Sequence, residues 1–271
     1  MRMQSIMVLI PAVAGFLWLL LYVLLTPKND FFRKQKRLIA LLSFFFLFAS
    51  LSSDTESKMM LHFVLFEQAC ALALAPCFIS LIREYGDNRK PGLLFKLCCM
   101  VPMIHVVVGV ESVYVAGFDN SVRIFIESLS FNGPMFPYLD DNADKVVYAC
   151  YTYIFKIFLL IGFLLFAINL MSCVINKGCR MKNTVSYLFR GAESELAPVL
   201  YFLALILFII VVPALVLGKE CYSNLPVATI FACLILTYLI SMLSITGMAG
   251  QVESQSVKGI VSSLKTKGYR K

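Results

Sequence analysis

Apolar and polar positions divide the chain into long apolar runs separated by shorter polar segments. A helix that crosses about 30 Å of hydrocarbon needs roughly 20 apolar residues, and seven runs approach or exceed that length. These runs cover residues 5–26, 38–53, 60–82, 93–116, 146–175, 196–217 and 226–249. The second run is the shortest, and as a helix it would span only about 24 Å. The pattern predicts an all-α, polytopic membrane protein with seven transmembrane helices.

The composition excludes an ordinary soluble domain. Hydrophobic residues make up 60% of the 271 positions and charged residues 15%, whereas a soluble domain has about 45–50% apolar and about 25% charged residues. So much apolar surface needs a lipid environment. The same composition excludes a disordered chain, which has few apolar residues.

Positive charge indicates how the predicted helices are oriented. The segments 27–37, 83–96, 174–195 and 250–271 hold 18 of the 24 Lys and Arg residues, and such residues accumulate in short cytoplasmic loops. This alternation predicts an external N-terminus and a cytoplasmic C-terminus. The first apolar run is interpreted as a retained helix rather than a signal peptide, because the basic run FRKQKR follows it instead of preceding it.

Three ionisable residues lie inside the predicted helices at similar depths. Glu67, His105 and Lys156 fall in the third, fourth and fifth helices, and Glu111 lies nearer the outer end of the fourth. Because such groups are costly in lipid, they commonly mark a function or a pairing. One interpretation is a cavity that binds a polar ligand or a proton. The alternative is a neutralising pair of Glu67 and Lys156, or a Lys156 side chain that extends towards the membrane surface.

The predicted outer loop 117–145 is acidic and aromatic. Its stretch VRIFIESLSF fits either a short strand or an interfacial helix, because its periodicity does not distinguish them. A loop of this length is commonly a lid or a binding segment, and the alternative is a solvated connector.

The same loop contains the sequence DDNAD. The spacing of Asp140, Asp141 and Asp144 matches the D-D-x-x-D pattern with which prenyl-transfer enzymes hold Mg²⁺ and a diphosphate. Those enzymes need a second aspartate-rich motif, which this chain lacks, and three Asp residues before a helix also suit a polar helix start. These residues are therefore only a weak metal candidate.

Other enzyme signatures are missing from the sequence. The chain has two His residues and contains neither the H-E-x-x-H nor the G-x-S-x-G nor the P-loop pattern. We expect no enzyme activity and no cofactor, with a membrane transferase as the minor alternative.

The tail 250–271 combines apolar residues at helical spacing with positive charge. Its basic residues are Lys258, Lys265, Lys267, Arg270 and Lys271. A basic amphipathic segment of this kind lies on anionic lipid, so we expect contact with the inner leaflet. Docking of a protein partner is the alternative.

Three segments carry a resemblance to a known family. The basic loop FFRKQKRLIALL, the third-helix ending LAPCFISLIREY and the fourth-helix stretch VPMIHVVVGV, in this order, resemble the seven-helix N-terminal half of bacterial membrane-anchored AraC-type transcription regulators. The resemblance implies the bacterial inner (plasma) membrane and a role in transcriptional regulation. Only 22 residues follow Ala249, too few for a helix-turn-helix, so we expect no direct binding to nucleic acid.

Two functions are compatible with these observations. The first is a sensor-like or anchoring module that signals through a cytoplasmic effector protein, with a second copy of the chain as a further candidate partner. A module of this kind could also be a shortened form of a longer regulator. The second is a small proton-coupled transporter, for which no internal repeat of the common kind is visible.

Overall fold

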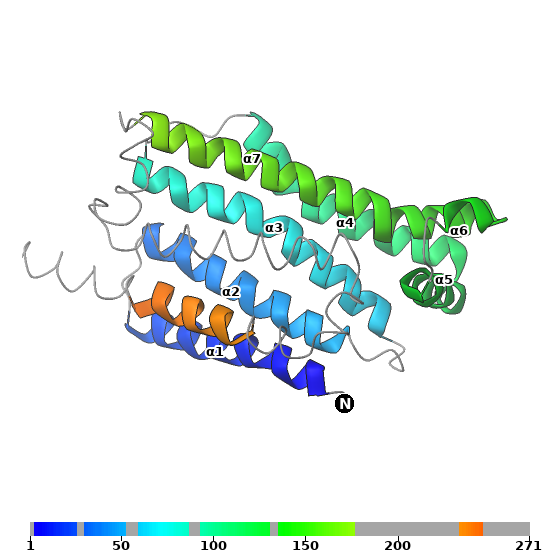
Figure 1. The fold of residues 1–271 in the computed structure, drawn as a ribbon, viewed down its shortest axis with the longest axis horizontal. Helices are drawn as coiled ribbons and strands as arrows, with labels where there is room; N and C mark the ends of the chain where they lie inside the picture. The colour runs from blue at the N-terminus through cyan, green and yellow to red at the C-terminus, as the bar shows by residue number, and fades with distance from the viewer. Residues whose placement is uncertain are drawn as a thin grey trace, which may run out of the picture.

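The computed structural model describes residues 3–25, 30–52, 59–86, 93–130, 135–176 and 233–245, and it contains no strand within these ranges. The helices lie in the order shown in Figure 1. Their bounds are α1 (Met3–Leu25), α2 (Asp30–Leu51), α3 (Met60–Gly86), α4 (Leu93–Ala116), α5 (Phe118–Ser130), the 3₁₀ turn η1 (Phe136–Tyr138), α6 (Asn142–Tyr148), the π-helical segment η2 (Ala149–Ile154), α7 (Phe155–Asn176) and a last helix, Cys233–Ile245.

Four helical stretches are long and apolar enough to cross a membrane. They are Val8–Leu25, Met60–Ser80, Phe95–Ala116 and Asn142–Ile168, and each overlaps a run predicted from the sequence. The predicted all-helical class is therefore confirmed for these segments, and their length and composition suit helices that span a membrane. The predicted run 196–217 lies outside the described residues. Of the run 226–249, only the shorter apolar helix Cys233–Ile245 is described.

Helix α2 begins eight residues before the apolar run predicted at 38–53. Its first turns contain the basic residues Arg33, Lys34, Lys36 and Arg37, which the sequence analysis placed in a loop. This extension lengthens the shortest run, but its charge keeps α2 out of the group of apolar spans. The buried side chain of Gln35 also lies in these turns.

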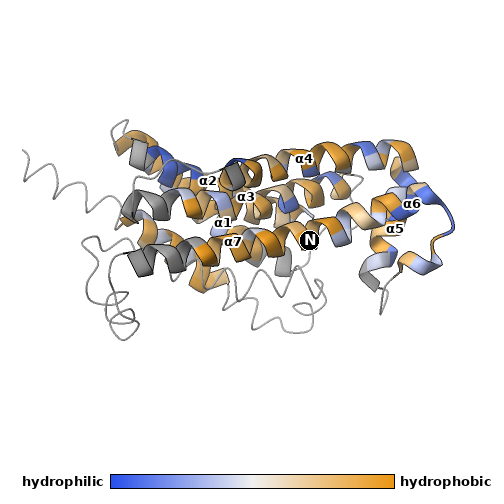
Figure 2. Cartoon of the chain, turned by 90° about the horizontal axis from the view of Figure 1, so that it is seen from above, coloured by the Kyte–Doolittle hydropathy of each residue, from blue (hydrophilic) through white to orange (hydrophobic). Residues whose placement is uncertain are grey.

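The helices pack side by side along one long axis, and each of the pairs α1–α2, α2–α3 and α3–α4 is antiparallel, whereas α3 and α7 run parallel. Helix α1 packs on α2, α2 on α3, and α3 on both α4 and α7. At Gly15 the backbone of α1 comes so near α2 that a Cβ atom would overlap Ser43 Oγ. The main core of buried side chains links α1, α2, α3, α7 and the last helix. Figure 2 shows long hydrophobic stretches on these helices and hydrophilic residues at the end formed by α5 and α6.

A polar seam joins the last helix to the first two. Trp18 Nε1 donates to Ser241 Oγ, Tyr22 Oη donates to the carbonyl of Ser244, and Gln35 Nε2 donates to the carbonyl of Leu243, each over 2.9 Å. These bonds connect positions more than 200 residues apart in the chain. They fix the last helix against α1 and α2 by hydrogen bonds as well as by apolar packing.

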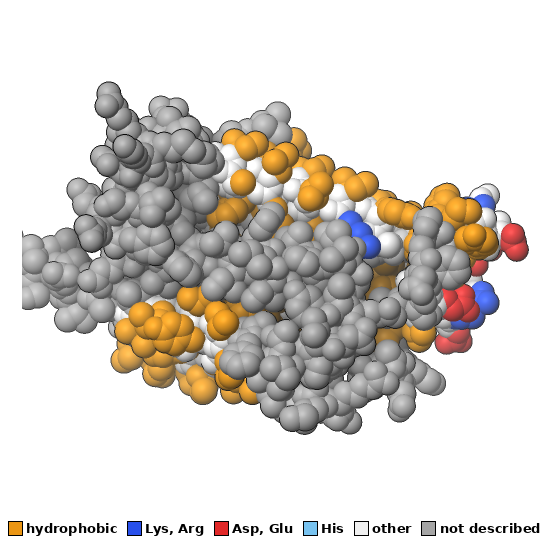
Figure 3. Space-filling model, viewed as in Figure 1, with side chains coloured by type: hydrophobic (Ala, Val, Ile, Leu, Met, Phe, Trp, Pro, Cys, Tyr) orange, Lys and Arg blue, Asp and Glu red, His pale blue; other side chains and the backbone are white. Residues whose placement is uncertain are grey.

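The stretch VRIFIESLSF, which fitted either a strand or a helix, lies in helix α5 up to Ser130. Its apolar side is buried, with Ile124 1% and Phe125 8% exposed. Gly117 alone separates α5 from α4, and its φ of 81° is a conformation that glycine adopts without steric cost. The charged side chains of this end gather at the tip of the molecule (Figure 3).

Candidate functional site

Glu67 is buried in α3 and faces α2. Its side chain is 4% exposed, and Oε2 accepts a hydrogen bond of 2.5 Å from Ser52 Oγ, just after the end of α2. A buried carboxyl group needs such a partner, because an unsatisfied polar group is costly away from water. The predicted burial of Glu67 is thus observed, and the Ser52 hydroxyl is one of its partners.

Gln68, the next residue, points in a different direction and joins three elements. Its Oε1 lies 2.9 Å from Nε2 of His105 in α4, and its Nε2 donates over 2.9 Å to the carbonyl of Tyr151 in η2. Gln68 is 6% exposed and His105 1% exposed. We call Gln68, His105 and the Tyr151 carbonyl the polar bridge.

The π-helical segment explains why the Tyr151 carbonyl can accept this bond. In an α-helix the N–H of Phe155 would bond to the carbonyl four residues earlier, which is that of Tyr151. Here the Phe155 N–H bonds to the carbonyl of Thr152 instead. The carbonyl of Tyr151 is therefore released from the α-helical ladder, and the side chain of Gln68 satisfies it. Such π segments occur frequently at functional sites.

Two predicted site residues do not join this network. Lys156 is half-buried and Glu111 is exposed. Within the described part of the chain, neither side chain makes a hydrogen bond or an ion pair. Glu67 and His105 therefore take part in two adjacent polar contacts, because His105 bonds to Gln68, the residue that follows Glu67 on α3. Lys156 pairs with neither of them.

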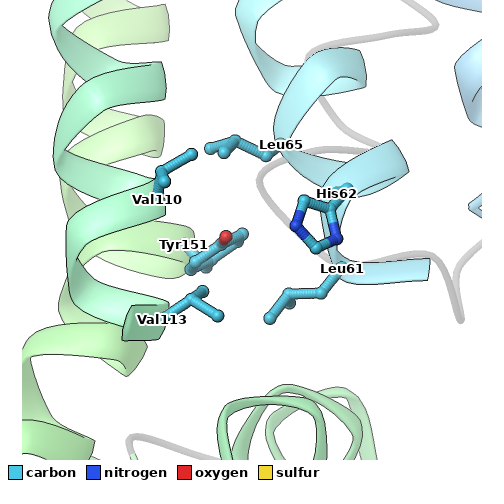
Figure 4. Close-up of a pocket in the computed structure, with 6 residues that line it drawn as sticks. All are labelled: Leu61, His62, Leu65, Val110, Val113 and Tyr151. Atoms are coloured by element: carbon cyan, nitrogen blue, oxygen red, sulfur yellow. The ribbon is translucent and has the colours of Figure 1, made fainter. Parts of the chain in front are cut away.

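A small cavity lies between α3, α4 and η2. Its volume is about 30 Å³, and it is lined by Leu61, His62, Leu65, Val110, Val113 and Tyr151. Figure 4 shows these side chains converging on one space, with the Tyr151 hydroxyl directed into it. On its other side, the His62 ring stacks on Phe118 of α5, with ring centres 5.4 Å apart. The cavity thus lies next to the α5 end of the bundle.

The three Asp residues of segment 117–145 have separate surroundings. Asp140 is exposed. Asp141 is the N-cap of α6 and accepts from the Ala143 N–H over 3.1 Å, while Asp144 accepts from Asn120 Nδ2 of α5 over 2.6 Å. Among the residues that the structure describes, no group of three or more His, Cys, Asp or Glu is arranged to hold a metal ion. The arrangement instead starts a helix and ties α5 to α6.

The basic residues of the tail, from Lys258 to Lys271, lie outside the described residues. Their predicted contact with lipid or with a partner stays a prediction.

Sequence reasoning did not select Ser52, Gln68, His62 or Tyr151. Gln68 carries the clearest signal, because an amide inside an apolar run commonly makes a hydrogen bond between helices. His62 lies in the same run, only two residues from its start. Nothing in the composition of the fifth run marks Tyr151, whose role depends on the π register.

Family models, curated proteins and solved structures give no match to this chain.

Proposed function

We propose that this chain is a sensor-like, multi-pass membrane protein that receives a stimulus at its α5 end and signals through a cytoplasmic effector protein. In this proposal the chain crosses the bacterial inner membrane seven times, with its N-terminus outside. The basic segments, including the first turns of α2, face the cytoplasm and its anionic lipids. A role in transcriptional regulation follows from the resemblance to AraC-type regulators, and a second copy of the chain is a candidate partner.

The observation that carries the proposal is the polar bridge at the π segment. A sensor needs two helix arrangements of similar free energy, between which a stimulus selects. A π segment offers such a pair, since its residues can return to α-helical bonding when the side-chain bond to the released carbonyl is broken. Gln68 makes that bond, and His105 of α4 binds the other end of the same amide.

The π segment also connects the α5 end to the helices that run through the bundle. It continues directly from α6 into α7. The Tyr151 ring packs edge-on against Phe125 of α5, with ring centres 5.9 Å apart. A change in the position of α5 would therefore reach Tyr151 first and α7 through the same continuous helix. Interhelical coupling of this kind is how small shifts at one site become helix movements.

A small proton-coupled transporter is the second candidate. The buried ionisable residues Glu67 and His105 favour it, because such groups inside membrane helices also mark proton pathways. It predicts a pH-driven flux in proteoliposomes that is abolished in Glu67→Gln. The sensor predicts no such flux.

The test is capture of a cytoplasmic partner from native membranes, with crosslinkers placed in segment 174–195 and in the tail. We compare wild type with Gln68→Leu, which removes the polar bridge. Gln35→Leu is the matched control, because Gln35 is also buried and also donates 2.9 Å to a backbone carbonyl of another helix. We expect a specific partner whose yield changes several-fold in Gln68→Leu and stays at the wild-type level in Gln35→Leu. Capture of no partner, or equal changes in both variants, would overturn the sensor proposal.

A further inference from the structure

Two polar side chains, His62 of α3 and Tyr151 of η2, line the cavity between α3, α4 and η2. The ring of His62 faces Tyr151 across this space (Figure 4). The Tyr151 hydroxyl makes no hydrogen bond within the described part of the chain, and Figure 4 shows it directed into the cavity. Buried polar atoms are nearly always paired with protein or with an ordered molecule. An occupant with a hydrogen-bonding group would give the Tyr151 hydroxyl a partner inside the cavity.

Its size and lining define that occupant. About 30 Å³ exceeds the ~10–15 Å³ that a water molecule needs, but it is far below the ~150 Å³ of a cavity that holds benzene. The remaining lining is aliphatic, from Leu61, Leu65, Val110 and Val113, and among the described residues no Asp, Glu, Lys or Arg lines the space. A small neutral molecule fits these walls, whereas an ion would lack a counter-charge.

A hydroxyl group can bond to both polar side chains. It can donate to one nitrogen tautomer of His62 or accept from the other, and it can likewise accept from or donate to the phenol of Tyr151. We propose that this cavity is a binding site for a small neutral hydroxyl compound, which bridges His62 and Tyr151. The hydroxyl comes from an ordered water in the resting protein and from a short-chain alcohol when the site is engaged.

This site would be the input of the sensor, and that role rests on the proposed function. Tyr151 contributes its side chain to the cavity and its carbonyl to the polar bridge. His62 contributes its ring to the cavity and stacks on Phe118 of α5. Exchange of water for a larger hydroxyl compound therefore acts on the π segment and on α5 at the same time.

The experiment uses the purified protein in lipid nanodiscs, without any partner, so its outcome is independent of the partner capture. The chain has two His residues, so isotope-labelled histidine gives two sets of ring signals in solid-state NMR. The variant His62→Phe identifies the His62 set. Magnetisation transfer from water to the His62 ring reports the occupant, and the buried His105 ring serves as the internal reference.

Two substitutions test the bridging geometry, and one controls for general effects. Tyr151→Phe removes only the hydroxyl group, and Val113→Phe fills the cavity. Val115→Phe places the same side chain on the same helix at a position that is 72% exposed. We expect strong water transfer to His62 in wild type and Val115→Phe, and its loss in Tyr151→Phe and Val113→Phe. Absence of transfer in wild type, or its persistence in both cavity variants, would overturn the site.

Methanol, as the probe alcohol, separates the two sources of the hydroxyl. With methanol added, we expect a contact between its methyl protons and the His62 ring and a loss of water transfer to that ring. Unchanged water transfer at saturating methanol would overturn the assignment of alcohols as ligands and of the cavity as the input. The proposed sensor function would then be tested by the partner capture alone.

Discussion

Two buried glutamines make the same bond in two regions of the molecule, in different surroundings. Gln35 and Gln68 each donate over 2.9 Å to a backbone carbonyl of another helix. The Oε1 atom of Gln35 is buried without a partner among the described residues, and its acceptor Leu243 lies in a regular α-helix. The Oε1 atom of Gln68 is bonded to His105, and its acceptor lies in a π segment.

This difference indicates that the bond of Gln35 has a structural role, whereas the bond of Gln68 is a candidate for a conformational switch. At the seam, the Gln35 amide donates to the carbonyl of Leu243, and the Tyr22 and Trp18 bonds hold the same helix. At the polar bridge, Gln68 is the donor that replaces a missing helical bond, so the conformation of η2 depends on it. The seam therefore stabilises one arrangement, whereas the bridge stabilises one of two.

The largest expected effect comes from the close approach of α1 and α2. In Gly15→Leu the new side chain would overlap Ser43 and meet the backbone of α2, whose Ser43 Cα lies 3.6 Å from the Cβ position. Overpacking of this kind costs about 1–3 kcal/mol, and we expect the upper end. The measurement is the free energy of unfolding in bicelles by titration with a denaturing detergent.

Gly109→Leu makes the same type of substitution where α4 packs on α3, and its cost can be compared with that of Gly15→Leu. A Cβ atom at Gly109 would meet the end of the flexible Leu65 side chain, which can move, so we expect about 1 kcal/mol. Equal decreases in the free energy of unfolding of the two variants would contradict our expectation that the α1–α2 packing is more rigid than the α3–α4 packing.

Gln68→Leu should lower the unfolding free energy by about 2 kcal/mol. The change leaves His105 Nε2 and the Tyr151 carbonyl unsatisfied, and each buried unsatisfied group costs about 1–3 kcal/mol. Deletion of Thr152 removes one residue from the π segment and should return it to α-helical hydrogen bonding. In that background we expect Gln68→Leu to cost clearly less, because the carbonyl of Tyr151 regains a helical donor. An undiminished cost would show that the bridge and the π segment are not coupled.

Gln35→Leu should cost less than about 1 kcal/mol in the same assay. One hydrogen bond is lost, but the unpartnered Oε1 atom leaves the interior with it, and the two contributions oppose each other. A cost as large as that of Gln68→Leu would remove the distinction between the two glutamines.

Ser241→Ala should have the smallest effect, about 0.6 kcal/mol, which is typical of a hydrogen bond between membrane helices. It removes the acceptor of Trp18 Nε1. Trp18 is the single tryptophan of the chain, so a shift of its fluorescence emission reports the change directly. An unchanged emission spectrum would indicate that the indole is not bonded at the seam.

The sequence predicted the spans better than it predicted their contacts. The runs that correspond to α1, α3 and α4 contain no Lys or Arg near their centres and few ionisable residues of any kind, so hydropathy locates them. The start of α2 was misplaced, because its four basic residues were interpreted as loop although helices tolerate them. The alternative interpretation of the three Asp residues as a polar helix start agrees with the position of Asp141 as the N-cap of α6.

The site was predicted in part. The depths of Glu67 and His105 indicated burial, and both side chains are buried. Their partners could not be predicted, since consecutive helical residues point about 100° apart, and Glu67 and Gln68 thus face different helices. The π segment could not be predicted either, because a single shift in hydrogen-bond register changes neither composition nor periodicity.

The one-residue connection at Gly117 has a mechanical consequence. Helix α4 ends at Ala116 and α5 begins at Phe118, and the carbonyl of Gly117 is tied to Ser121 by bonds from its N–H and its hydroxyl, of 3.0 and 2.8 Å. A connection of one residue allows little independent movement, so the orientation of α5 follows that of α4. A spectroscopic label on the exposed side of α5 should therefore report the tilt of α4, and a flexible insertion at 117 should uncouple the two helices.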